Sequence, residues 1–331
     1  MTGTAPDDVP PALSIIVPTY RDGPRIYSYL VRLDRALAQI GEPYELIVVS
    51  DGNSDNTRDE AQRLAAPHVH VYHYTRNMGK GFALRYGMAR SCGEIVTFID
   101  GDGDIDPVQI ATYVRIMRET KADIVIASKR HRDSQVVYPP LRRLYSVTYQ
   151  ALLRVLFHLQ VRDTQVGLKL FRREVLAAVL PRIVVKRYAF DLELLVVAHH
   201  LGFSRVVEAP VRIGQRFSST INRQAIASIL WETAAILYRK NVLRYYDHCH
   251  LPGALDSLSA VTEAELVTMT ERERIARHVV RWLVESWAEI VRSCYTSARA
   301  RSARARFDQQ TMSDDHQGVE EPDEERWRAR V

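Results

Sequence analysis

Between Leu13 and about Ser128, short apolar runs alternate with longer amphipathic stretches. Each apolar run has the length of a strand, and the runs read LSIIV, ELIVV, VHVYHY, EIVTFI and DIVIA. Between them, apolar side chains recur at helical spacing over residues 26–40, 55–65, 79–91 and 107–119. This alternation predicts an α/β fold with a mostly parallel central sheet and helices on both faces.

Polar clusters directly follow three of the predicted strands. They are Thr19-Tyr20-Arg21, Ser50-Asp51-Gly52 and Asp100-Gly101-Asp102. In open parallel sheets, ligands bind beyond the carboxyl ends of the strands. We therefore expect these clusters to converge on one binding site.

After Ser128 the alternation loosens and a basic stretch appears, SKRHRDSQVVYPPLRR. A helix is predicted next over 141–158, and the segments after it read as VGLKLF, a helix over 191–200, the strand-like RVVEAPVRI and a helix over 222–246. We expect these elements to close the site that the first half of the chain opens.

The two ends of the chain differ in composition from residues 13–250. Residues 1–12 contain acids and prolines where a signal peptide needs basic and then apolar residues, so we predict a disordered leader. Residues 251–307 predict a basic helical extension. Residues 308–331 hold eight carboxylates against three arginines and predict a disordered acidic tail. Residues 254–331 together offer a surface for a partner protein.

Composition narrows the class of protein. With 331 residues, of which 46% are hydrophobic, the chain can bury a full core. Cys92, Cys249 and Cys294 have unrelated spacings, which implies no disulfide framework and favours the cytoplasm. No window has the roughly eighteen apolar residues of a membrane span. A net charge of +5 suggests phosphate partners, but the arginine-rich segment 272–306 lacks the interleaved aromatics typical of nucleic-acid binding.

The strongest chemical signal is FIDGDGDIDP, where an apolar strand runs into Asp100, Asp102 and Asp104. Acids this close repel one another unless a cation offsets their charge. An EF-hand loop is excluded, because Ile105 and Ala111 stand where it needs Gly and Glu. An aspartyl-phosphate phosphatase remains a minor alternative, and a solvated acidic turn explains less of the pattern.

Six blocks occur in the order typical of one family: IIVPTYRDG, VVSDGNSDNT, TRNMGKGFALRYGM, FIDGDGD, RDTQVGLKLFRRE and KRYAFDLELL. In this order they resemble the family 2 glycosyltransferases with the GT-A fold, and most of all the dolichyl-phosphate and polyprenyl-phosphate hexose synthases, over roughly residues 13–220. The resemblance implies a GT-A domain over 13–250, with a donor half (13–128) and an acceptor half (129–250).

The resemblance also implies a metal site. In the family, the Asp-x-Asp motif holds Mg²⁺ or Mn²⁺ against the donor diphosphate, which assigns Asp100 and Asp102 to the metal and makes Asp102 catalytic. Asp104 stands where the family often has Gln, and it is either a third ligand or a supporting group. A non-catalytic relative would have lost a metal acid, and both are present.

Further family positions are expected to bind the donor: Pro18, Thr19, Tyr20, Asp51, Arg76, Asn77, Lys80, Asp100 and Gln165. Arg216 matches an arginine aimed at the diphosphate, and Asp163 matches a block near the reacting sugar, so both are predicted to be catalytic. Some of the acidic positions have a plainer alternative. Asp51 and Asp163 are also typical of turns, and Asp191 and Glu193 either reach the sugar or anchor a helix start.

The resemblance implies inverting transfer of a hexose from a nucleoside diphosphate sugar to a polyprenyl phosphate. Lys129, Arg130, Arg132 and Arg142 are expected to bind the acceptor phosphate. The blocks DTQVGLKLF and YAFDLELL favour UDP-glucose over GDP-mannose as donor. We expect peripheral contact with the inner, cytoplasmic face of a membrane, and a soluble or glycan acceptor is the alternative.

Overall fold

The computed structural model describes residues 10–52, 55–136, 140–214 and 223–248, with the backbone alone at 140–145, 223–225 and 248. The chain divides into two compact units, Met1–Met269 and Thr270–Val331. All described residues belong to the first unit. The predicted basic extension and acidic tail lie outside the described residues, as does the leader up to residue 9.

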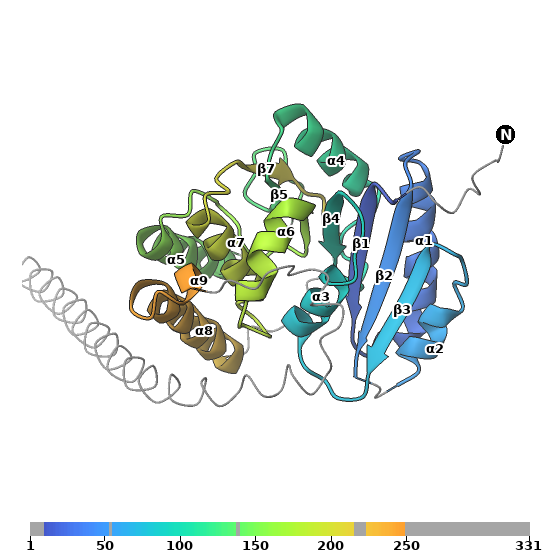
Figure 1. Ribbon diagram of the computed structural model, residues 1–331, viewed down its shortest axis with the longest axis horizontal. Helices are drawn as coiled ribbons and strands as arrows, with labels where there is room; N and C mark the ends of the chain where they lie inside the picture. Colours follow the sequence, from blue (N-terminus) through green and yellow to red (C-terminus); the bar gives the residue numbers. More distant parts are fainter. Residues whose placement is uncertain (1–9, 53–54, 137–139, 215–222, 249–331) are drawn as a thin grey trace, which may run out of the picture. The chain divides into compact units, whose positions relative to one another are not determined.

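A mixed α/β unit is formed, as the alternating pattern predicts (Figure 1). The strands are β1 Leu13–Thr19, β2 Tyr44–Asp51, β3 Val69–Tyr74, β4 Ile95–Ile99, β5 Ile124–Ser128, β6 Leu168–Arg172 and β7 Val206–Pro210. The helices are α1 Gly23–Ala38, α2 Thr57–Gln62, α3 Lys80–Met88, α4 Gln109–Thr120, α5 Pro140–Phe157, α6 Arg173–Val179, α7 Phe190–His200, α8 Arg223–Asn241 and α9 Tyr245–His248, with a 3₁₀ turn at Leu180–Arg182.

The strands form one seven-stranded sheet in the order β3-β2-β1-β4-β6-β5-β7. Strand β6 is antiparallel to both of its neighbours, and every other neighbouring pair is parallel. Thr19 pairs with Ser50, and Ile16 with Phe98, so β1, β2 and β4 end at one edge. The polar clusters predicted to meet therefore follow strands that end side by side.

Two hydrophobic clusters cover the two faces of the sheet. Because side chains alternate along a strand, Ile15 and Val17 of β1 share a cluster with α1 and α4, whereas Ile16 shares one with α3 and the helices from α5 onward. Both faces are buried, which explains why the strands read as continuous apolar runs. The prediction of helices on both faces is confirmed.

Two details differ from the sequence prediction. Helix α6 was not predicted, and the helix expected over 222–246 ends at Asn241, before the separate α9. The backbone N–H groups of Val242 and Leu243 both donate to the carbonyl of Tyr238, and Arg244 has φ of 45°. This tightened last turn and a left-handed residue end a helix that the apolar pattern alone continues.

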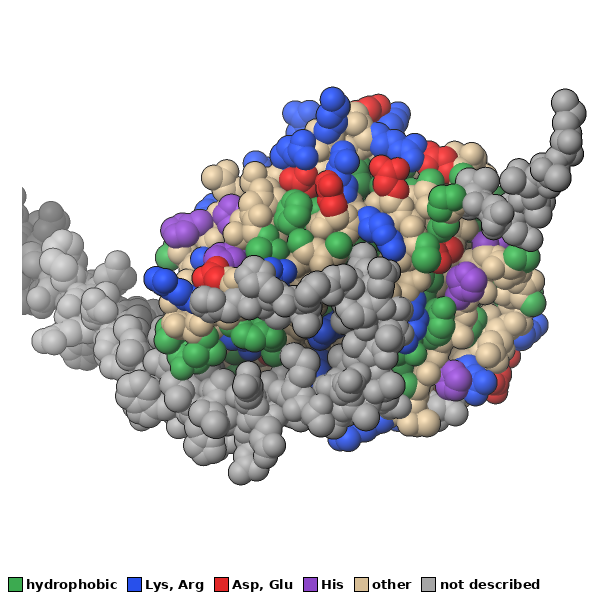
Figure 2. Space-filling view, in the orientation of Figure 1, with side chains coloured by type: hydrophobic (Ala, Val, Ile, Leu, Met, Phe, Trp, Pro, Cys, Tyr) green, Lys and Arg blue, Asp and Glu red, His purple; other side chains and the backbone are tan. Residues whose placement is uncertain are grey.

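On the face drawn in Figure 2, acidic and basic side chains lie next to one another around α4. Arg118 of α4 is paired with Glu42, and Arg115 lies 3.9 Å from Glu119. These two pairs offset part of the charge around α4. None of the described helices is long and apolar enough to cross a bilayer.

Candidate functional site

A cavity of about 590 Å³ opens where β1, β2 and β4 end. Its lining residues are Pro18, Thr19, Tyr20, Asp22, Asp51, Asn77, Gly79, Lys80, Asp100, Gly101, Asp102, Gln165, Arg187, Tyr188 and Asp191. Most of the donor-binding residues predicted from the sequence are therefore together in one place. The expected convergence of strand-end clusters is observed for Thr19-Tyr20, Asp51 and Asp100-Gly101-Asp102.

Strand β4 delivers Asp100 to this cavity, and all five residues of the strand are buried. The backbone N–H of Asp100 donates to the carbonyl of Gly167 at 3.2 Å. A Cβ at position 167 would lie 2.0 Å from Oδ2 of Asp100 and 2.4 Å from its Cγ. The carboxylate keeps its place only because residue 167 has no side chain.

The ammonium of Lys80 contacts the carboxylate of Asp100. Lys80 Nζ lies 2.6 Å from Oδ1 and donates a hydrogen bond to Oδ2 at 2.9 Å. Lys80 is the first residue of α3, and Gly79 before it has φ of 97°, a conformation that favours glycine. The turn Gly79-Lys80 thus presents a cation to the strand end.

Asp51 is buried, and its carboxylate binds the backbone of the same turn. Oδ1 accepts a hydrogen bond from Met78 N at 2.7 Å, and Oδ2 accepts one from Gly79 N at 2.9 Å. These bonds fix the approach to Lys80. Asp51 also lines the cavity, and its contact with a base and ribose stays a prediction.

Burial and mutual repulsion disfavour the ionised acids of the cavity. Burial raises the pKa of Asp100, with the neighbouring Lys80 opposing the shift. Burial also raises the pKa of Asp102, to which repulsion from Asp104 adds. Burial is also the main cause of the raised pKa of Asp22. A bound cation would favour the ionised forms.

Asp100 and Asp102 are suited to be the protein ligands of a divalent cation whose other ligands come from the substrate. Although Lys80 lies close by, Oδ1 of Asp100 is buried and accepts no hydrogen bond of good geometry from the described residues. Mg²⁺ is typically held by one or two carboxylates together with substrate phosphates. In the described part of the chain, no three Asp, Glu, His or Cys side chains are placed to hold one ion. Asp104 does not line the cavity, so the geometry does not bring it in as a third ligand.

Helix α7 presents Asp191 to the cavity and buries Glu193. Asp191 accepts a hydrogen bond at 3.0 Å from Lys169, a fully buried residue of β6 whose pKa is lowered by burial. Glu193 has no exposed surface and accepts bonds from the N–H groups of Val184 and Val185 at 2.9 and 2.7 Å. Of the two acids that the sequence left open, only Asp191 lines the cavity.

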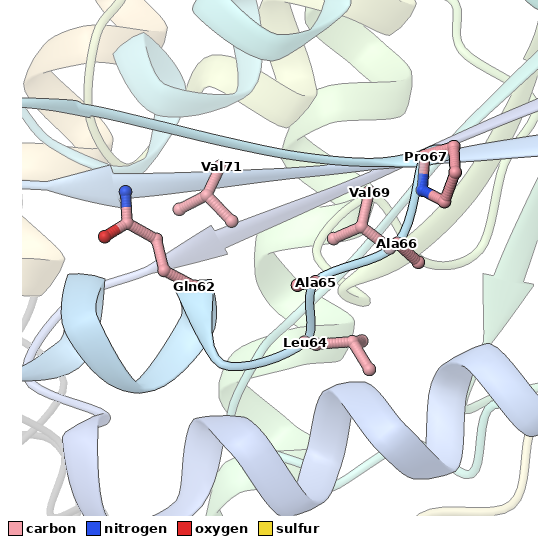
Figure 3. Close-up of a pocket in the computed structure, with 7 residues that line it drawn as sticks. All are labelled: Gln62, Leu64, Ala65, Ala66, Pro67, Val69 and Val71. Atoms are coloured by element: carbon pink, nitrogen blue, oxygen red, sulfur yellow. The ribbon is translucent and has the colours of Figure 1, made fainter.

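A second hollow of about 500 Å³ lies between the end of α2 and the edge strand β3 (Figure 3). Its lining residues are Gln62, Leu64, Ala65, Ala66, Pro67, Val69 and Val71, which include no titratable group. It therefore offers no catalytic chemistry, and the cavity at the strand ends is the candidate site.

The sequence profile of glycosyl transferase family 2 matches residues 14–180, about half of the chain. The chain belongs to this family. The matched region contains β2 to β6, all of β1 except Leu13, and both Asp100 and Asp102.

Curated members of the family resemble the chain further. A dolichyl-phosphate beta-glucosyltransferase of Trichomonas vaginalis is 32% identical over 214 residues, which cover 60% of this chain and 62% of that protein. The enzyme of the same name from Drosophila melanogaster is 34% identical over 209 residues, with coverages of 57% and 63%. The chain thus matches less than two thirds of the length of these relatives.

Solved structures show the same fold. Glucosyl-3-phosphoglycerate synthase from Mycobacterium tuberculosis, in complex with uridine diphosphate, superposes with a TM-score of 0.53 at 20% identity, covering 70% of this chain and 80% of that one. This family 2 glycosyltransferase therefore has the GT-A fold predicted from its sequence.

Three residues of the glycosyltransferase cavity were missed by the sequence analysis: Asp22, Arg187 and Tyr188. Asp22 follows β1, its N–H donates to Thr57 Oγ1 at 2.9 Å, and its carboxylate accepts a bond from Tyr20 N. The sequence could have indicated Asp22 as a site residue, because an acid that closely follows a predicted strand lies near the edge where ligands bind. Arg187 and Tyr188 lie in a loop, and nothing local in the sequence places that loop beside Gly79.

Besides Asp104, the predicted site residues Arg76 and Asp163 lie away from the cavity lining. Arg76 is exposed, next to Asn77, which does line the cavity. Asp163 is buried, and it accepts hydrogen bonds from Lys129 N at 3.2 Å and Gln165 N at 3.1 Å. It thus has the turn role that was its alternative, and a catalytic role stays a prediction.

The predicted acceptor cations lie only partly within the described structure. Lys129, Arg130 and Arg132 follow β5, which is parallel to β4 through the shared antiparallel neighbour β6, so they lie at the edge of the sheet where the cavity opens. The side chain of Arg142 and the whole of Arg216 are outside the described residues.

Proposed function

We propose that the chain transfers glucose from UDP-glucose to a polyprenyl phosphate with inversion at the anomeric carbon. The observation that carries this proposal is the pair Asp100 and Asp102 in a cavity at the strand ends of a family 2 fold. The names of the relatives, dolichyl-phosphate beta-glucosyltransferases at 32% and 34% identity, support glucose as the sugar and a lipid phosphate as the acceptor.

Asp100 and Asp102 would hold Mg²⁺ or Mn²⁺. Structures of the mycobacterial synthase were solved in complex with Mn²⁺ or Mg²⁺ and uridine diphosphate, which supports such an ion in this fold. When bound, the ion offsets the charge that builds on the departing diphosphate. Lys80, Arg187 and Arg216 would add positive charge to the same leaving group.

The remaining cavity residues would orient the donor. Pro18, Thr19 and Tyr20 would line the base, with Asp51 and Asn77 beside the ribose. Gln165 and Asp191 would face the sugar. The acceptor phosphate, held by Lys129, Arg130, Arg132 and Arg142, is already ionised near neutral pH. It can attack the anomeric carbon without a strong general base, so catalysis depends on positioning and charge.

Replacing Gly167 by Ala should lower the transfer rate about 100-fold, because displacement of a reacting group by about 1 Å has effects of this order. The new Cβ would overlap Oδ2 of Asp100. Transfer rate and thermal unfolding are measured together. Gly214→Ala is the control, since the nearest atom to a Cβ there is 3.8 Å away. Wild-type rates in Gly167→Ala would show that the position of Asp100 is unimportant.

The proposed acceptor places the protein peripherally at the cytoplasmic face of a membrane. Helix α5 carries the exposed Arg154 and Val155, and Val242 and Leu243 are exposed after α8. Apolar side chains beside cations are typical of contact with anionic lipid surfaces. In the sequence, the basic residues 129–132, which follow β5, are succeeded by Arg142 and Arg143 in α5.

With radiolabelled UDP-glucose, polyprenyl phosphate and Mn²⁺, we expect label to enter the organic phase. GDP-mannose should serve poorly as the donor. The protein should sediment with anionic liposomes, and high salt should weaken this binding because it screens surface charge. Label found only in water-soluble products, with no liposome binding, would replace the lipid acceptor by a soluble or glycan acceptor.

A further inference from the structure

The ammonium of Lys80 contacts the carboxylate of Asp100, which a divalent cation would need as a ligand. Its ammonium lies 2.6 Å from Oδ1 and 2.9 Å from Oδ2 of Asp100. Among the described residues, Lys80 Nζ donates a hydrogen bond to no other side chain or carbonyl. We infer that Lys80 is a built-in counter-cation at Asp100, which makes tight binding of the divalent cation conditional on a nucleoside diphosphate that draws the ammonium away. The inference rests on the proposed function and adds an inhibitory contact in the ligand-free protein.

The backbone around Lys80 is held in place. Asp51 binds the N–H groups of the two residues before Lys80. A Cβ at Gly81 would lie 2.6 Å from Cβ of Phe190, and one at Gly79 would lie 2.8 Å from the carbonyl oxygen of residue 186. The start of α3 is therefore wedged between β2 and the loop before α7. The ammonium of Lys80 can therefore leave Asp100 only by movement of the Lys80 side chain, and not by movement of the backbone.

The side chain of Lys80 can make that movement. It is 40% exposed and lines the cavity. Asp22, Asp102 and Asp191 line the same cavity, as does the cation Arg187, so acids outnumber cations around the ammonium. A lysine ammonium is protonated near neutral pH, and its contact with the carboxylate of Asp100 favours the charged form. The group that moves is thus a permanent cation.

Competition follows from the charges. A divalent ion and an ammonium repel each other strongly at contact distance, so an ion that arrives alone must first break the Lys80–Asp100 pair. A diphosphate changes this balance, because its oxygens can take up the ammonium and also bind the ion. Diphosphate and divalent ion then strengthen each other's binding by one common factor, and Lys80 increases that factor.

Binding of Mn²⁺, followed by the electron paramagnetic resonance signal of the free ion, tests this in the full chain with and without saturating UDP. Without UDP, Lys80→Met should bind Mn²⁺ about tenfold more tightly than the wild type, and the factor by which UDP strengthens Mn²⁺ binding should fall about tenfold. Lys80→Arg keeps the charge and should resemble the wild type. Lys121→Met, at the end of α4, is the matched control.

Equal or weaker Mn²⁺ binding by Lys80→Met in the absence of UDP overturns the inference. Circular dichroism verifies folding, and Lys80→Gln repeats the comparison with a different uncharged side chain. Sugar transfer is not read in this experiment. A protein that shows the predicted Mn²⁺ pattern and transfers no sugar contradicts the proposed function and leaves the inference standing. Absence of Mn²⁺ binding by every variant, even with UDP, overturns the inference together with the metal assignment.

Discussion

Asp102→Asn is expected to reduce sugar transfer by about 10³-fold, the order found when a group that stabilises developing charge is removed. Without metal, the variant should also unfold slightly higher than the wild type, by about 1 °C or less once solvent screening of an exposed side chain is counted. The reason is that burial raises the pKa of Asp102, so its ionised form is disfavoured in the folded state. An uncharged amide removes that penalty.

The sign of this stability effect depends on pH. An acid whose pKa is raised in the folded state destabilises the fold above that pKa, and the effect disappears as pH falls below the unfolded value near 3.9. The gain in Asp102→Asn should therefore be present at pH 7 and absent at about pH 3.5. Adding Mn²⁺ and UDP should stabilise the wild type more than the variant. Asp59→Asn, an exposed acid on α2, is the control, and near-normal transfer in Asp102→Asn would contradict the metal assignment.

Glu193→Ala is expected to lower the free energy of unfolding by about 3–5 kcal/mol, the cost of breaking a buried ion pair from one side. Oε1 of Glu193 accepts hydrogen bonds from Arg239 Nη2 at 2.9 Å and from the hydroxyl of Tyr246 at 2.6 Å. Oε2 accepts the N–H groups of Val184 and Val185. Alanine would leave a buried guanidinium and three further donors without their acceptor.

Chemical denaturation followed by circular dichroism measures this loss. Glu119→Ala is the matched control, because Glu119 is exposed on α4 and its partner Arg115 lies 3.9 Å away. Such exposed pairs contribute about 0–1 kcal/mol. The loss of stability in Glu193→Gln should lie between these two values. The amide keeps one acceptor oxygen, but its NH₂ group would face groups that are themselves hydrogen-bond donors. A loss below about 1 kcal/mol in Glu193→Ala would mean that water or a shifted Arg239 replaces the carboxylate.

Glu193 also connects stability to the site. The N–H groups that it binds belong to the loop that continues to Arg187 and Tyr188, both of which line the cavity. Further along that loop, Ala189 N donates a hydrogen bond to Glu232 of α8 at 2.6 Å. Helices α7 and α8 therefore hold this cavity loop from inside the protein.

The order of strands and helices up to β5 could be predicted from the sequence, because it depends on local periodicity. Ile15 and Val17 alternate with Ile16 between two covered faces, and an uninterrupted apolar run is what such a strand requires. Asp51 and Asp100 could be placed at the strand ends for the same reason. Their residue types, read in order with the other blocks, were enough to indicate the family.

The tertiary structure decided which distant groups meet. Lys80 and Asp100 belong to different βα units, and they contact one another only because β1 and β4 are neighbours in the sheet. The reversed direction of β6 sets Gly167 against Asp100 and buries Lys169 beneath Asp191. Asp191 and Glu193 look alike in the sequence, but the turn of α7 directs one to the cavity and the other to Arg239. Local patterns specify the faces and ends of elements, whereas contacts between residues far apart in the chain depend on strand order and helix packing, which no local pattern contains.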